Sequence, residues 1–71
     1  MTKITFKAAR ISAGYTQEAL AEKMGVSRQT IINWENGNRE IRTPQLFMFC
    51  QLTNYKGEDI LVPKKSTISR R

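Results

Sequence analysis

Side chains that could read DNA bases are concentrated in the segment from Arg28 to Asn36. If this segment is helical, successive residues turn by about 100°, so amide side chains at helical spacing share one outer side. These amides are Gln29, Asn33 and Asn36, with Arg28 and Ile32 flanking them, whereas Thr30, Ile31, Trp34 and Glu35 lie on the opposite side. An Asn or Gln amide can bond adenine N6 and N7 together, and an Arg guanidinium can bond guanine O6 and N7. The outer side is therefore suited to reading base edges in a major groove.

The amino-acid composition of the chain excludes several other kinds of site. Histidine is absent and Cys50 is the only cysteine, which excludes a disulfide within the chain, Cys/His zinc sites and His-based catalysis. Ser27 has no evident base beside it, and the acidic residues do not converge on a pocket. We therefore expect a binding protein and not an enzyme, with no cofactor, metal or small-molecule substrate. Cys50 is interpreted as a small buried hydrophobic residue.

The size and hydropathy of the chain indicate one small soluble domain. Its 71 residues leave no room for a second hydrophobic core. The longest apolar run, from Leu46 to Cys50, is five residues, far below the roughly 20 that a membrane helix needs. No secretory signal follows Met1. We expect a cytoplasmic protein, in a bacterial cell or a phage-infected host, that does not contact membranes.

A net charge of +6 favours an anionic partner, nucleic acid before membrane, but the charge is unevenly placed. Four of the basic residues lie after Pro63 with no acid among them: Lys64, Lys65, Arg70 and Arg71. Residues 1–62 then carry only +2. We interpret 1–62 as the folded domain and 63–71 as a basic tail, either flexible and solvated or an arm that contacts phosphates.

Helix signals divide residues 1–62 into about five short helices, and no stretch shows the alternation of a strand. The expected elements are a helix from about Lys3 or Thr5 to Ala13, helices over 17–24 and 28–36, a helix from Thr43 as N-cap to about Thr53, and a last turn over 58–61. Thr16 and Ser27 are good N-caps for the second and third helices. The predicted fold class is all-α.

The second and third helices are joined only by Gly25, Val26 and Ser27. So short a connection is typical of a helix-turn-helix corner, in which Gly25 adopts positive φ and small Ala21 lets the helices approach. Arg10 and Glu35 each lie on the inward side of their helices, and a partly buried charge needs a partner. We therefore predict that they form an ion pair that fixes the first helix to the third.

Residues 17–37 carry a motif, QEALAEKMGVSRQTIINWENG, that resembles the helix-turn-helix of the Cro and phage-repressor (XRE-like) family. The resemblance covers roughly residues 4–62 and implies a lambda-repressor-like fold that binds double-stranded DNA. It implies base contacts by Arg28, Gln29 and Asn33. It implies contacts to the DNA backbone by Gln17, Thr30, Asn36, Asn38, Arg39 and Arg42. Gln17 would also help to orient Gln29, and the inward Arg10 and Glu35 match members of the family.

Several apolar side chains do not fit the predicted core. Ile32 stands where the family usually has a small or polar residue, and it could touch either a thymine methyl or a protein. In the fourth helix, Phe47, Met48 and Leu52 are turned away from the inward stripe. They would form a protein interface, unless the last turn and the loop at Tyr55 fold over Phe47 and Leu52.

Two functions follow from these patterns. The first is a small DNA-binding regulator in a phage genetic switch, dimeric so that two third helices lie about 34 Å apart. The alternative is a modulator or antirepressor that keeps the fold but binds a companion repressor. The sequence leaves open which of them applies, and it does not define the operator.

Overall fold

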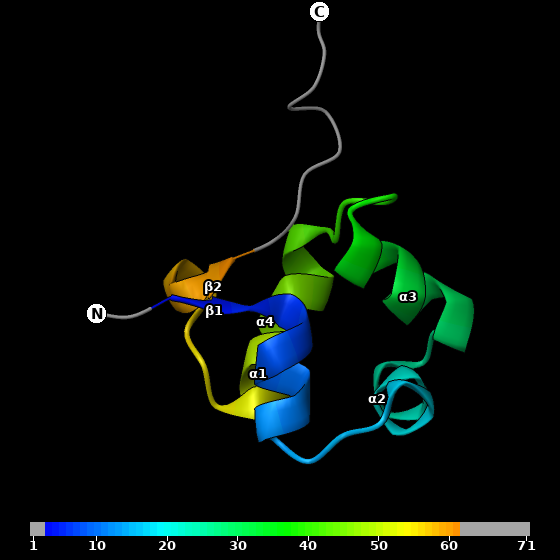
Figure 1. Ribbon diagram of the computed structural model, residues 1–71, viewed down its shortest axis with the longest axis horizontal. Coiled ribbons are helices and arrows are strands. Elements are labelled where there is room, and N and C mark those ends of the chain that lie inside the picture. The colour runs from blue at the N-terminus through cyan, green and yellow to red at the C-terminus, as the bar shows by residue number, and fades with distance from the viewer. Residues whose placement is uncertain (1–2, 62–71) are drawn as a thin grey trace, which may run out of the picture.

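The computed structural model describes residues 3–61, and these form a compact bundle of short helices (Figure 1). The α-helices are α1 (Phe6–Ser12), α2 (Gln17–Met24), α3 (Arg28–Asn36) and α4 (Thr43–Thr53). A 3-10 helix (η1, Gly57–Asp59) and two short strands, β1 (Ile4–Thr5) and β2 (Ile60–Leu61), complete the described part. The all-α class is confirmed, whereas the expected number of about five helices becomes four α-helices in this range. The basic tail predicted over 63–71 lies outside the described residues.

The ends of the described chain differ from the prediction. The last turn, expected over 58–61, is a 3-10 helix followed by β2, which pairs in parallel with β1. Ile4 is paired with Ile60, whose side chain is buried in the core. Strands of two residues are too short to show alternation, so the sequence could not reveal them. α1 begins at Phe6 because Thr5 is its N-cap, accepting a hydrogen bond from Ala8 N at 3.0 Å.

The start of α4 is one residue earlier than predicted. Arg42, not Thr43, is the N-cap, and the Gln45 side chain accepts a hydrogen bond from Arg42 N at 3.4 Å. Pro44 still lies in the first turn, where its missing N–H costs no helical hydrogen bond.

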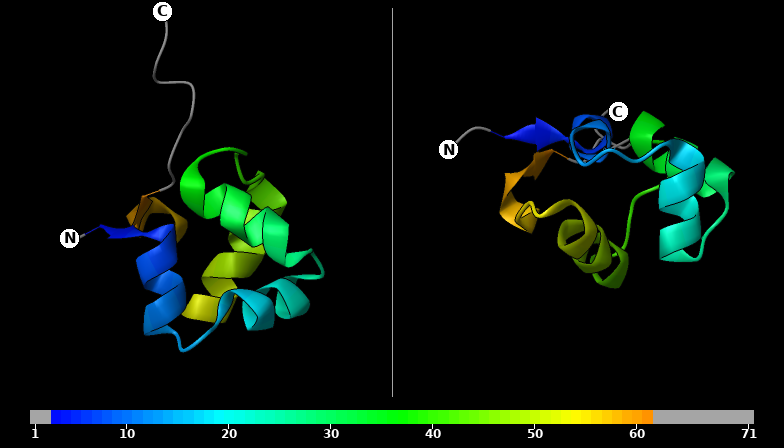
Figure 2. Two further views of the ribbon diagram at one scale, coloured as in Figure 1. Left: turned by 45° about the vertical axis from the view of Figure 1, so that its right-hand side comes forward. Right: turned by 90° about the horizontal axis from the view of Figure 1, so that it is seen from below.

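The corner between α2 and α3 agrees with the prediction at both helices' bounds (Figure 2). Thr16 Oγ1 accepts from Ala19 N at 3.0 Å, and Ser27 Oγ accepts from Thr30 N at 3.2 Å. Gly25 has φ of 71°, a conformation that residues with a Cβ rarely adopt. The sharp turn places α3 at the edge of the molecule (Figure 1).

The inner side of α3 packs into the hydrophobic core. Phe6 of α1 stacks on Phe49 of α4 with ring centroids 4.0 Å apart, and its ring also meets Trp34 edge-on at 6.0 Å. Trp34 and Ile31 are both buried, together with Leu20 of α2. Since all four helices contribute to this cluster, the outer side of α3 is presented on a supported surface. No helix within residues 3–61 is long and apolar enough to cross a membrane.

Candidate nucleic-acid interface

The outer side of α3 carries the predicted base-reading residues in accessible positions. Arg28 and Gln29 are exposed, and Asn33 is half-buried. Gln29 Nε2 donates a hydrogen bond to Asn33 Oδ1 at 3.1 Å, so the two amides already lie side by side in the free protein. Because this bond uses one donor and one acceptor, each amide keeps further groups for a base edge.

Arg28 is accompanied by a residue that the sequence did not single out. Arg28 Nε lies 3.6 Å from Glu18 Oε2, and both side chains are largely exposed, at 55% and 72%. Glu18 is in the first turn of α2 and Arg28 in the first turn of α3. Because both side chains are exposed, nothing in the sequence distinguishes this pair from two separately solvated charges.

A groove between α3 and the start of α4 collects three of the predicted DNA-backbone residues: Thr30, Arg39 and Arg42. Trp34 and Ile41, both buried, also line it. The N-terminus of an 11-residue helix, α4, opens beside these arginines, and helix N-termini attract anions. Asn36 and Asn38, near the end of α3, are exposed. The groove thus brings two arginines together beside a helix N-terminus, with Glu40 also in its lining.

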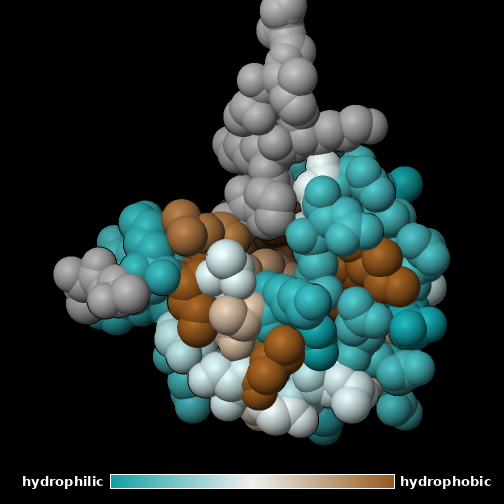
Figure 3. Space-filling model, in the orientation of Figure 1, coloured by the Kyte–Doolittle hydropathy of each residue, from teal (hydrophilic) through white to brown (hydrophobic). Residues whose placement is uncertain are grey.

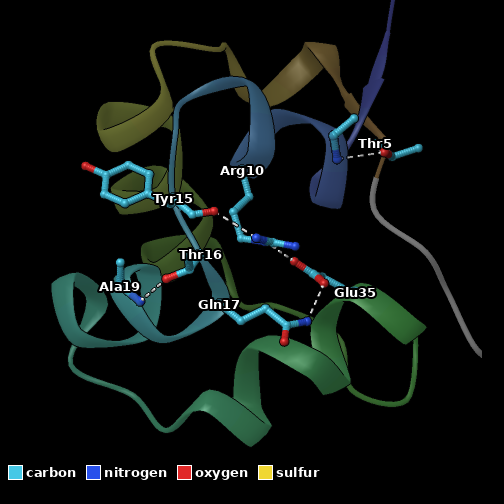
Figure 4. A network of polar contacts seen from close by, with 8 residues as sticks. Thr5, Arg10, Tyr15, Thr16, Gln17, Ala19 and Glu35 are labelled. Carbon is cyan, nitrogen blue, oxygen red and sulfur yellow. Dashed lines mark hydrogen bonds and ion pairs between the residues drawn. The ribbon is translucent and has the colours of Figure 1, made fainter.

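A buried polar network connects α3 to α1 and α2 (Figure 4). Arg10 Nε donates to Glu35 Oε2 at 2.6 Å, and the side chains are only 8% and 5% exposed. Arg10 Nη1 donates to the Tyr15 carbonyl at 2.8 Å, and Gln17 Nε2 donates to Glu35 Oε1 at 3.0 Å. The predicted Arg10–Glu35 pair is present. Both Glu35 oxygens are satisfied, as a buried carboxylate requires.

The resemblance implied that Gln17 helps to orient Gln29, but the structure shows no hydrogen bond between their side chains. Gln17 is half-buried and bonded to Glu35, while Gln29 is bonded to Asn33. The reason is that Glu35 offers a buried carboxylate oxygen, and a bond to a charged acceptor is stronger than one between two amides. Gln17 therefore connects the start of α2 to α3.

The apolar residues of α4 differ in their exposure to solvent. Phe47 and Met48 are exposed, at 65% and 43%. Leu52, predicted to turn away from the core, is partly buried and packs against it, as does Tyr55 from the following loop. An apolar groove beside Phe47 is lined also by Leu46, Cys50 and Gly57. Phe47 and Met48, with this groove, are called the α4 surface below.

Cys50 is partly accessible at this groove and not fully buried as the sequence suggested. Partial burial raises the pKa of the Cys50 thiol, because desolvation disfavours the charged thiolate. Ile32 is half-buried and is the one apolar residue of α3 that remains accessible. The surface over α3 is mostly hydrophilic with a small hydrophobic area (Figure 3).

Comparisons with known proteins agree with this geometry. Residues 6–60 match the model of a family described as helix-turn-helix. The chain is 45% identical over 47 residues to an uncharacterized HTH-type transcriptional regulator of Methanocaldococcus jannaschii, an alignment that covers 66% of this chain and 71% of that protein. No solved structure matches the chain.

Proposed function

The chain belongs to the helix-turn-helix family, and from this premise we propose that it is a transcriptional regulator that docks α3 in the major groove of operator DNA. One observation carries the proposal. The amide and guanidinium side of α3 is accessible beyond the corner at Gly25, while Ile31 and Trp34 on its other side are buried. A similar relative that is named as a transcriptional regulator supports the same function.

In this proposal the residues of α3 and of the following loop have separate roles. Arg28 pairs with guanine, and Gln29 and Asn33 bond adenine or adjacent base edges. Backbone contacts come from Gln17, Thr30, Asn36, Asn38, Arg39 and Arg42, of which Thr30, Arg39 and Arg42 share the groove beside α4. The chemistry is binding alone, and it takes place in the cytosol.

We include dimerisation in the proposal, with the α4 surface as the contact. Two copies are needed to read successive major grooves about 34 Å apart. A phenylalanine that is 65% exposed is a large apolar group for a chain of this size to leave in water. The setting we propose is a phage genetic switch, on the strength of the resemblance to Cro and phage repressors.

Selection of duplexes from a pool with about 20 randomised base pairs, enough for two half-sites, tests the DNA function directly. We expect one enriched sequence that binds with nanomolar affinity. If Arg39 and Arg42 of two copies neutralise about four phosphates, affinity should fall about 10²-fold between roughly 50 and 200 mM salt. The DNA proposal would be wrong if no sequence were enriched, or if binding did not depend on salt.

A second candidate function is supported by the same α4 surface. The chain could be a modulator that binds a companion repressor, because Phe47 is exposed and residues 1–62 carry a charge of only +2. Mixing the purified protein with the repressor encoded beside it, with and without operator DNA, separates the two functions. A 1:1 protein complex, formed by a chain that does not bind DNA alone, would favour the modulator.

Phe47→Gln tests the role of the α4 surface. We expect this variant to melt within a few °C of wild type, since surface changes usually alter stability by about 0.5 kcal/mol or less. We expect it to lose self-association by at least tenfold, because contacts at the centre of an interface cost about 1–2 kcal/mol or more when removed. Light scattering over a concentration series measures the proportions of monomer and dimer. Ile11→Gln, at an exposed isoleucine of α1, is the matched control; equal association of both variants and wild type would contradict the assignment.

A further inference from the structure

Glu18 is placed where it acts on the proposed DNA contact of Arg28. Its carboxylate lies 3.6 Å from Arg28 Nε. Among the four α-helices within residues 3–61, only α2 has an acidic residue in its first turn. The Glu18 carboxylate is thus the one acidic group in the first turns of these four helices.

The ion pair leaves the Nη1–Nη2 edge of the Arg28 guanidinium free to contact a base. A guanidinium has five N–H donors in a planar fork. When Nε faces Glu18, the edge formed by Nη1 and Nη2 remains available, with two parallel N–H groups that match guanine O6 and N7. Holding one edge also limits the rotation of a long side chain that is 55% exposed. The pair thus orders the guanidinium before it meets DNA.

The same carboxylate also repels DNA of any sequence. Glu18 is 72% exposed, so its charge is not shielded by the protein. At a helix that enters the major groove, phosphates lie on both sides, and a nearby carboxylate is repelled by them. This repulsion weakens binding to every duplex alike, so sequence discrimination comes from the ordering of Arg28 and not from the charge of Glu18.

From the placement of Glu18 beside Arg28 we infer that Glu18 is a positioning residue that raises the sequence discrimination of Arg28. This inference rests on the proposed DNA-binding function and names a specificity determinant within the same site. Glu18 does not contact a base itself. It acts on discrimination through the orientation of Arg28, while its charge lowers the affinity for every duplex.

Glu18→Gln in the full chain tests the inference. Binding is measured to three duplexes: the selected sequence, the same sequence with the guanine that Arg28 requires replaced, and an unrelated sequence. The required guanine is the position at which Arg28→Ala loses its preference. We expect Glu18→Gln to bind the unrelated duplex about two- to fivefold more tightly, the range that an exposed charge pair supports. Discrimination against the replaced guanine should fall by about threefold or more.

Two controls separate this role from charge or fold effects. Glu22→Gln removes the same charge one turn later on α2, at an exposed residue, and should leave discrimination at the guanine unchanged. In an Arg28→Ala background, Glu18→Gln should also leave it unchanged, because the effect acts through Arg28. Circular dichroism melting confirms that each variant is folded.

The outcomes distinguish this inference from the proposed function. If the wild-type protein prefers a sequence and Glu18→Gln discriminates as well as Glu22→Gln, the role of Glu18 is wrong and the DNA function stands. If the wild-type protein shows no sequence preference, the proposed function is wrong and this inference falls with it.

Discussion

Arg10→Ala is expected to lower the free energy of unfolding by about 3–5 kcal/mol, because it leaves the Glu35 carboxylate buried without its cation. Glu35 would keep only the hydrogen bond from Gln17 Nε2. For a domain of this size the loss corresponds to a fall in Tm of about 12 °C or more. Thermal and urea unfolding followed by circular dichroism measure it. Since small domains have only about 5–15 kcal/mol of stability, much of the variant would be unfolded near 37 °C.

Lys7→Ala is the matched control, because Lys7 is an exposed cation on the same helix. Its removal should change stability by about 0.5 kcal/mol or less. Glu35→Ala alone should also be strongly destabilising, and the double variant should lose less than the sum of the two single losses. An Arg10→Ala protein that melts like Lys7→Ala would show that the ion pair does not hold α1 to α3.

The parts of the fold that local chemistry determines were predicted from the sequence. The bounds of α2 and α3 follow from Thr16, Ser27 and the glycine that ends each helix, and they agree with the structure. The pairing of Ile4 with Ile60 was not predicted, because it depends on packing between residues far apart in the chain. The shift of the α4 N-cap from Thr43 to Arg42 reflects a side chain, Gln45, that reaches back to the backbone.

The same division applies to the candidate site. The Arg10–Glu35 pair was predictable because an inward charge needs a partner, so burial itself carries the signal. The pairing of Glu18 with Arg28 was not predictable. Two exposed charges give no pattern in the sequence that distinguishes an ion pair from two separately solvated residues. The sequence left open whether Leu52 is covered, since helical periodicity does not say how the chain after α4, including Tyr55, packs; in the structure both residues pack against the core.

Gln29→Ala is expected to weaken binding to the selected duplex by about 1–3 kcal/mol per copy, or about five- to 150-fold, by removing one base contact from each copy. Binding to an unrelated duplex should stay the same, since backbone contacts supply it. The salt dependence should also stay the same because glutamine carries no charge. The fold should be retained, since Gln29 is exposed and alanine is the better helix former. Fluorescence anisotropy with both duplexes over a salt series measures these effects.

Arg39→Ala gives the contrasting result that makes the assignment testable. This exposed arginine lines the groove beside α4 and contacts phosphate in our proposal. Its removal should weaken binding to both duplexes alike and reduce the slope of log affinity against log salt by about 1 per copy. Removing a base-reading residue changes the discrimination between the two duplexes and leaves the salt slope unchanged. Removing a phosphate contact changes the salt slope and leaves the discrimination unchanged. If Gln29→Ala behaved like Arg39→Ala, or left the selected duplex fully bound, α3 would not read bases through its amide side.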